Sequence, residues 1–268
     1  MDLDPGEYYD NLDRIFSKAA SIYDERIQAN FINVNIRDKE IETVVKRYVP
    51  GWRVLEIGCG TGEEARKVID ATGCELTCID VAKGMIEFAS NKMVKFGLSN
   101  KFKGLKLPAS SLGSVGGKFG IVYSFNGALN NEPLLSKFFQ ALDEVVETGG
   151  YFIVSVRNRL SLGEILVDLL RLNPDSFFKR ISGEMSVEVA GNGVKSHYFY
   201  NSEFLKQVPS SFKLTQMRGL GIFMIPSFHE KIVTEGARNL LSRLEKAFVD
   251  FPVFNHFGDE TLFVFKKN

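Results

Sequence analysis

The sequence predicts a doubly wound α/β domain built on a mostly parallel sheet of seven strands. Short apolar runs alternate with helical patterns from about residue 36 to residue 156, which is the rhythm of repeated strand–helix–strand units. A glycine-rich turn follows the first of these runs, at residues 58–62. The length of 268 residues suits one large α/β domain or a domain that carries an insertion.

Each element of this fold has its own local signal. The expected strands are residues 53–57, 75–79, 102–106, 120–125, 150–156, 212–221 and 261–266. A helix is predicted to begin near Glu63 and another at Pro133, the latter with one apolar stripe and an end at Gly149-Gly150. Ser202 is predicted to cap a short helix, and residues 229–248 to form the last long one.

Residues 158–200 break the alternation. They contain an amphipathic segment over 162–172, then Asn173-Pro174, then two strand-like runs around 191–193. We therefore expect an N-terminal part with helices and a binding core over 1–157, an inserted cap over 158–200, and the rest of the same α/β domain over 201–268. Ligands of open α/β sheets bind at the carboxyl ends of the strands, where this segment starts, so we expect it to cover the ligand. A peripheral dimerisation arm is the alternative.

Composition excludes several classes of protein. Lys plus Arg and Asp plus Glu number 33 each, so no overall basic charge favours nucleic acid. The start, residues 1–6, is acidic and broken by Pro-Gly, unlike a signal peptide. No run reaches the roughly 18 to 20 apolar residues of a membrane span. We expect a cytoplasmic monomer or homodimer.

Metal binding and disulfide bonds are not expected. Cys59, Cys74 and Cys78 form no C-x-x-C pair, and their number is odd. The three histidines, His197, His229 and His256, do not stand at the spacing of metal ligands.

The strongest motif is the run from Glu56 to Gly62, in which glycines occupy positions 58, 60 and 62. Glycine lets the backbone turn sharply and approach a ligand closely, although a tight turn without a ligand is an alternative. A dinucleotide fingerprint requires a further glycine at position 63, where this chain has Glu63. With Glu64, this helix start carries two carboxylates that oppose a pyrophosphate but suit a cationic sulfonium or ammonium group.

Asp80 ends the second predicted strand. A carboxylate at this place can accept hydrogen bonds from both hydroxyls of a ribose. The alternative is an ordinary aspartate that caps the next helix.

These residues, with the segment 125–130 and Gly149-Gly150, resemble the class I, Rossmann-like methyltransferases that use S-adenosylmethionine (SAM), in particular the small-molecule subgroup related to quinone C-methyltransferases. The resemblance is good over residues 15–156. It implies that SAM is the cofactor and that Glu56 and the glycine turn hold its methionine part, Asp80 its ribose, and Val81 and Met85 its adenine. Phe125 and Asn126 would separate cofactor from acceptor, and Tyr23 would close over the methionine end. The implied cofactor-binding residues are Tyr23, Glu56, Gly58, Cys59, Gly60, Gly62, Asp80, Val81, Met85, Ala109, Ser110, Phe125 and Asn126.

Two departures from the family pattern stand out. Many relatives carry an aspartate beside the adenine amino group, whereas this chain reads Leu-Pro-Ala-Ser-Ser over 107–111, so Ser110 or a backbone carbonyl would serve. The fourth strand begins Phe119-Gly120 instead of Phe-Asp, which we expect to weaken packing there. The Asn-Pro-Pro-Tyr motif of base-amino methyltransferases is absent, which disfavours adenine N6 chemistry.

The expected function is methyl transfer from SAM to a small, apolar or aromatic molecule by in-line displacement. If a general base takes part, the candidates are His197, His229 and Tyr198. The identity of the acceptor and the atom that is methylated stay open. The alternatives are a noncatalytic SAM-binding protein and an RNA methyltransferase, the latter suggested by five lysines between residues 92 and 106.

Overall fold

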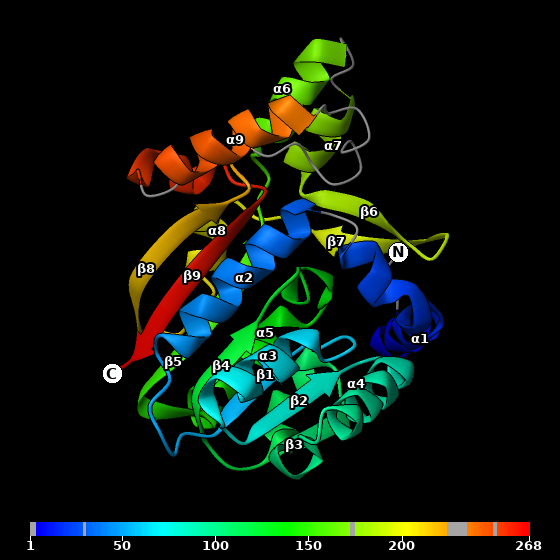
Figure 1. Cartoon of the computed structure of the whole chain (residues 1–268), viewed down its shortest axis with the longest axis vertical. Coiled ribbons are helices and arrows are strands. Elements are labelled where there is room, and N and C mark those ends of the chain that lie inside the picture. Colours follow the sequence, from blue (N-terminus) through cyan, green and yellow to red (C-terminus); the bar gives the residue numbers. More distant parts are fainter. Residues whose placement is uncertain (1–3, 29–30, 172–174, 224–234, 249–250) are drawn as a thin grey trace.

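The computed structural model describes residues 4–28, 31–171, 175–223, 235–248 and 251–268. Its main sheet has seven strands in the order β3-β2-β1-β4-β5-β9-β8 (Figure 1). The strands are β1 (Val54–Ile57), β2 (Leu76–Asp80), β3 (Phe102–Lys106), β4 (Phe119–Ser124), β5 (Val146–Arg157), β8 (Phe212–Leu220) and β9 (Glu260–Lys267). Neighbouring strands from β3 to β5 pair in parallel, and β9 runs antiparallel between β5 and β8. The predicted mostly parallel, seven-stranded sheet is confirmed.

The sheet is covered on both faces. On one face, α5 (Leu135–Val145) and α8 (Asn201–Leu205) bury phenylalanines such as Phe138 and Phe204 against the strands. On the other face lie α2 (Phe31–Val45), α3 (Glu63–Thr72) and α4 (Lys83–Lys95), with α1 (Pro5–Gln28) packed against α4 (Figure 1). The cysteines Cys74 and Cys78 are free and belong to this second core. Two apolar layers thus hold the carboxyl ends of β1, β2 and β4 in one place.

Three predictions about local structure are wrong. The helix expected from Pro133 to Gly149 spans only α5, because Val146 already pairs with Phe119 of β4. The short helix α8 begins at Asn201, so Ser202 is not its cap. Gly120 does not weaken packing, because a Cβ there would lie 2.2 Å from Trp52, whose ring fills the space.

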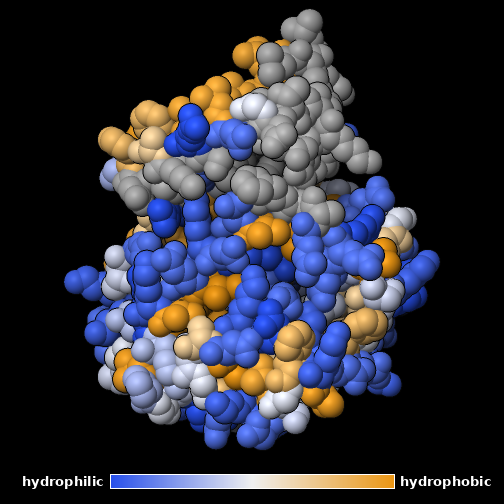
Figure 2. Space-filling view, in the orientation of Figure 1, coloured by the Kyte–Doolittle hydropathy of each residue, from blue (hydrophilic) through white to orange (hydrophobic). Residues whose placement is uncertain are grey.

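The segment 158–200 forms α6 (Leu162–Arg171), α7 (Asp175–Ser182) and a separate antiparallel hairpin of β6 (Glu184–Val189) and β7 (Asn192–His197). The helix α7 was not expected. The two helices pack against each other, whereas the hairpin contacts α1 through β6 (Figure 1). The last helix, α9 (Glu235–Phe248), comes before β9 in the chain. Apolar side chains are exposed around α9 and the turn after it, where Figure 2 shows hydrophobic surface; they include Leu240, Phe248, Phe251 and Val253. In the part of the chain that the structure describes, no helix is long and apolar enough to cross a membrane.

Candidate cofactor site

The glycine turn is held against the carboxyl end of β2. Gly58 and Gly60 have φ values of 72° and 52°, a region that glycine enters without strain. The N–H of Gly58 donates to the Ile79 carbonyl at 2.8 Å, and the N–H of Gly60 donates to Oδ2 of Asp80 at 2.9 Å. A Cβ on Gly58 would lie 2.2 Å from that of Ala128, so a larger residue does not fit. The turn is therefore a rigid backbone surface.

This turn forms one wall of a cavity with about 780 Å³ of empty space, its open mouth included. Ten of the thirteen predicted cofactor residues line it: Tyr23, Gly58, Cys59, Gly60, Asp80, Val81, Met85, Ala109, Phe125 and Asn126. Eleven further residues line the cavity and were not among the predicted cofactor residues: Tyr9, Leu12, Phe16, Arg37, Ile57, Glu64, Leu107, Pro108, Ala128, Asn131 and Glu132. Most of them come from α1, from α2 or from the segment after β4, far from the glycine turn in the sequence.

Three predicted cofactor residues do not line the cavity. Gly62, with φ 75°, faces α4, where an added Cβ would lie 2.8 Å from the Cβ of Ala89, so it serves helix packing. Glu56 is 3% exposed and accepts a hydrogen bond from Sγ of Cys78 at 3.9 Å, and burial raises its pKa well above the ordinary value. Ser110 is engaged with Tyr9 and Glu132.

The structure is compatible with both roles considered for Asp80, the helix cap and the ribose acceptor. Its Oδ1 accepts a hydrogen bond from the N–H of Ala82 at 2.9 Å, just before α4, while the side chain also lines the cavity. With the bond from Gly60, two of about four lone-pair sites on the carboxylate are used, which leaves two for ribose hydroxyls. Burial raises the pKa of Asp80 to about 6.

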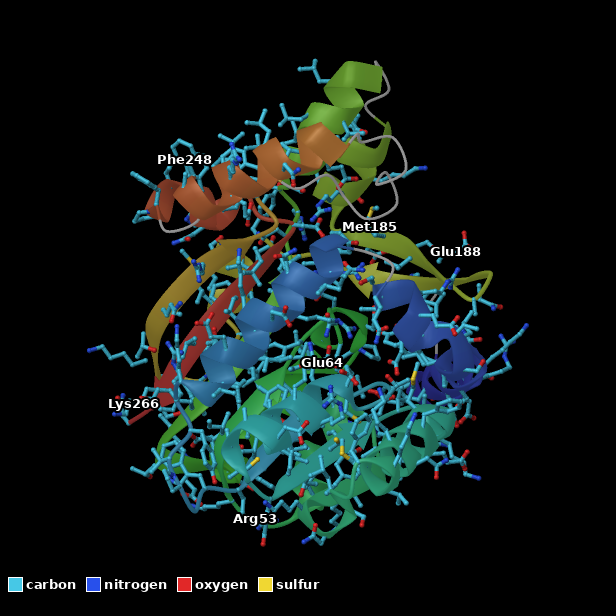
Figure 3. The ribbon with its side chains drawn as sticks, in the orientation of Figure 1. Arg53, Glu64, Met185, Glu188, Phe248 and Lys266 are labelled. Carbon is cyan, nitrogen blue, oxygen red and sulfur yellow. The ribbon has the colours of Figure 1, made fainter. Side chains whose placement is uncertain are left out.

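A buried ion pair lies on the cavity wall beside the glycine turn. Nη1 of Arg37 is 2.6 Å from Oε1 of Glu64, and its Nε donates to Oδ1 of Asn126 at 3.1 Å. Figure 3 shows Glu64 in the middle of the molecule, beside α2. Burial disfavours the charge of Arg37, but the Glu64 carboxylate and the other acidic groups around the arginine together outweigh it and raise the arginine pKa. A cation and an anion side by side suit the carboxylate and ammonium groups of a free amino acid.

The helix α1 is fastened over the turn. A Cβ added to Gly60 would lie 3.5 Å from the Tyr23 ring, so this ring covers the glycine. The next residue, Asp24, accepts a hydrogen bond from the Thr61 hydroxyl and lies 2.6 Å from Nζ of Lys92. The Tyr-Asp pair thus links α1 to both the turn and α4.

The candidate bases stand elsewhere. His197 is at the end of β7, with its ring 4.6 Å from that of Phe199, and lines a second cavity with Tyr8 and Lys195. Burial lowers its pKa. The Tyr198 hydroxyl accepts a hydrogen bond from Nη1 of Arg157 at 3.1 Å. Neither side chain lines the cofactor cavity, and His229 lies outside the described residues.

Comparison with known sequences finds a methyltransferase domain and a methyltransferase among the similar proteins. A methyltransferase domain family matches residues 54–150. An uncharacterised protein of Methanocaldococcus jannaschii is 28% identical over 179 residues, which are 67% of this chain and 60% of that protein. A ubiquinone/menaquinone biosynthesis C-methyltransferase of Brucella anthropi is 24% identical over 157 residues, 56% of this chain and 59% of the relative. The matches thus span about three-fifths of the length of these two relatives.

Solved structures share the fold. An S-adenosylmethionine-dependent methyltransferase from Clostridium acetobutylicum has a TM-score of 0.61 at 16% identity, over 94% of this chain and 98% of that one. The [4+2]-cyclase SpnF has a TM-score of 0.57 at 18% identity, over 86% and 81% of the two chains. Fold alone does not define activity, since one of these two neighbours is a cyclase. The chain thus matches a methyltransferase domain family over residues 54–150, has the Rossmann-like fold of SAM-dependent methyltransferases, and is similar in sequence to quinone C-methyltransferases.

Proposed function

We propose that this protein moves the methyl group of SAM to a small, apolar or aromatic molecule by in-line displacement. The observation that carries the proposal is a single cavity that joins the glycine turn and Asp80 to the Arg37–Glu64 pair. A ribose and a free amino acid occur together in SAM, so one ligand accounts for both features.

Each group has a role in holding the cofactor. Asp80 accepts the ribose hydroxyls, Arg37 binds the methionine carboxylate, and Glu64 binds the methionine ammonium group. Val81 and Met85 contact the adenine ring from the side of α4. SAM supplies an activated methyl carbon, so the protein mainly has to align the acceptor with it in a dry site, which can lower the barrier by about 7 to 11 kcal/mol.

The acceptor would bind beside Tyr23 and Phe125. The guanidinium of Arg37 lies 5.9 Å from the centre of the Tyr23 ring, and Phe125 directly precedes Asn126, so both rings are at the methionine end of the cavity. Two aromatic walls favour a flat or apolar acceptor. No histidine is among the described residues that line this cavity, which favours alignment over general base catalysis.

We propose that the segment 158–200 acts as a cap through its hairpin. Val189 and Val194 of the hairpin pack against α1 at Leu12, Ile15 and Phe16. In the described part of the chain, the segment contributes no side chain to the cofactor cavity itself, whereas α1 contributes several. The hairpin thus supports the roof that α1 forms. An arm for dimerisation stays the alternative.

The RNA methyltransferase alternative finds less support. Two of the five lysines behind it have acidic partners: Nζ of Lys92 is 2.6 Å from Asp24 and 3.2 Å from Glu63, and Nζ of Lys106 is 2.6 Å from Asp13. Lysines neutralised in this way add little to an electrostatic surface for phosphates.

A label-transfer experiment tests the proposal. The protein is incubated with methyl-labelled SAM and a whole-cell extract, and label is measured in the organic, RNA and protein fractions. We expect label in the organic fraction, strongly reduced with Asp80→Ala and unchanged with the control Asp70→Ala. Asp70 lies on α3, and its ion-pair partner among the described residues is Arg66. Label in RNA alone, or none above the Asp80→Ala level, would reject the proposal in favour of one of the two alternatives.

A further inference from the structure

The carboxylate of Glu132, which the sequence analysis did not assign, lines the cofactor cavity directly after the turn Leu129–Asn131. Its Oε1 accepts hydrogen bonds from the N–H of Leu134 at 2.9 Å and from the Tyr9 hydroxyl. Its Oε2 accepts one from the N–H of Ser110 at 3.1 Å. Three donors, from α1, from the segment after β3 and from the start of α5, fix this side chain in position.

The hydrogen-bond count leaves one acceptor position. An ionised carboxylate offers about four lone-pair sites, of which three are used here. Oε1 has two donors and Oε2 has one, so the remaining site is on Oε2. An ionised carboxylate cannot donate, so only a ligand group with an N–H or O–H can fill it.

The lining residues near Glu132 define the shape of that ligand. Ala109 and Pro108 directly precede Ser110, the donor to Oε2, and they line the cavity together with Leu107, Val81 and Met85. These five residues form an apolar surface, and Asp80 lies next to Val81. A flat heteroaromatic ring with an amino group on its edge fits an apolar surface that ends at a carboxylate.

We propose that Glu132 accepts a hydrogen bond from the exocyclic amino group of the adenine ring and so makes the site specific for adenine. The inference rests on the proposed function, because it takes SAM as the ligand. Ser110, predicted for this role, does not line the cavity; its N–H donates to Glu132 and its Oγ lies 2.8 Å from the Tyr9 hydroxyl. The carboxylate of Glu132, which follows β4 in the chain, thus takes the place of the aspartate that many relatives carry after the third strand.

A hydrogen bond to Glu132 would distinguish adenine from hypoxanthine. Hypoxanthine carries an oxygen where adenine carries its amino group, so its acceptor would face the Glu132 acceptor. A site built around a hydrogen bond rejects an analogue that cannot make it, because the buried polar group loses its partner. The preference for adenine over hypoxanthine should therefore depend on this one carboxylate.

Calorimetry with two ligands tests it. S-adenosylhomocysteine and S-inosylhomocysteine are titrated into wild type, Glu132→Gln and Glu87→Gln, the last being an exposed glutamate of α4 that pairs with Lys83. We expect wild type and Glu87→Gln to bind the adenine compound at least tenfold more tightly, and Glu132→Gln to bind the two within threefold of each other. The ratio is taken within one protein, so a general loss of stability cancels.

The outcomes distinguish a wrong role for Glu132 from a wrong proposed function. A full preference retained by Glu132→Gln, with tight binding of S-adenosylhomocysteine, overturns this inference and leaves the proposed function intact. No binding of S-adenosylhomocysteine by wild type overturns both. If Glu132→Gln fails to fold, Glu132→Asp replaces it, since this carboxylate is withdrawn by one methylene; the preference should fall there too, and its full retention would count against the proposal.

Discussion

Asp80 is a buried carboxylate whose ionisation should control cofactor binding. Burial raises its pKa from 3.8 to about 6 in the free protein. In the proposed site the ribose hydroxyls donate to the ionised form of Asp80, so binding below pH 6 would first have to release a proton. We therefore predict that SAM affinity falls by up to about tenfold for each pH unit below 6 and is level above pH 7, as measured by calorimetry from pH 4.5 to 8.

The same rise in the pKa of Asp80 has the opposite effect on the stability of the fold. Because the pKa of Asp80 is higher in the folded chain than in the unfolded one, its stabilising contribution is full below about 3.8 and is lost as the pH rises through 6. The free protein thus gives up stability at neutral pH to keep Asp80 charged, as the ribose-binding role proposed for it requires. Asp80→Asn is the control, since it should remove the step in affinity near pH 6; a step that survives this change would assign the titration to another group.

Arg37 should recognise the amino-acid part of the cofactor and nothing else. We predict that Arg37→Met weakens binding of S-adenosylhomocysteine by about 1.5 to 3 kcal/mol, the range for hydrogen bonds to charged groups. Binding of 5′-methylthioadenosine, which lacks the amino acid, should change less than threefold. Both are measured by calorimetry.

The comparison of the two ligands separates recognition from damage to the site. Removal of Arg37 leaves Glu64 without its cationic partner, which affects the fold with either ligand. Arg66→Met, on α3 and paired with Glu63 and Asp70, is the matched control and should bind both ligands as wild type does. Equal losses for both ligands in Arg37→Met would show that Arg37 serves only the structure.

At the scale of elements, Gly62 sets how closely α3 and α4 pack. A Cβ at this position would lie 2.8 Å from the Cβ of Ala89, and its φ of 75° is left-handed. Overpacking and the left-handed backbone each cost about 1 to 2 kcal/mol, so Gly62→Ala should lower the free energy of unfolding by about 2 to 4 kcal/mol. Urea denaturation measures the change.

Gly97 provides the matched control for this prediction. Its φ is 71°, close to that of Gly62, but an added Cβ meets nothing within 4 Å. Gly97→Ala should therefore report the backbone cost alone, about 1 to 2 kcal/mol. Equal losses in the two variants would mean that close packing of α3 on α4 contributes nothing.

At the scale of the whole molecule, the cavity joins parts that are far apart in the chain. Its lining comes from α1, from α2, from the glycine turn and from the segments after β2, β3 and β4. A ligand there should stabilise the fold as one unit. At a concentration of S-adenosylhomocysteine a hundred times its Kd we predict about 2.7 kcal/mol of stabilisation, or a rise in Tm of about 5 to 10 °C.

Scanning calorimetry measures this rise, with NAD at the same concentration as the comparison. NAD should give little change, because Glu63 and Glu64 at the start of α3 oppose a pyrophosphate. A larger rise with NAD would contradict the family's cofactor preference in this chain.

The sequence by itself determined the features that depend on neighbouring residues. The parallel strands follow from short apolar runs, and the cofactor turn follows from three glycines after β1, because backbone conformation and periodicity are local properties. Asp80 could be found for the same reason, as it ends a strand at a recognisable distance from the turn. The helix α7 carried too weak a pattern, and Gly62 could not be told from Gly60 without knowing what faces it.

Only the tertiary structure decided which distant side chains meet at the cavity. The hydrogen bond from Arg37 to Asn126 joins residues 89 positions apart, and the one from Tyr9 to Glu132 joins residues 123 positions apart. No local pattern marks such residues, because the packing of α1 and α2 over the sheet brings them together. The chain encodes the backbone of the site locally and the charges around it through packing, which is why the glycine turn was predicted whereas Arg37 and Glu132 were not.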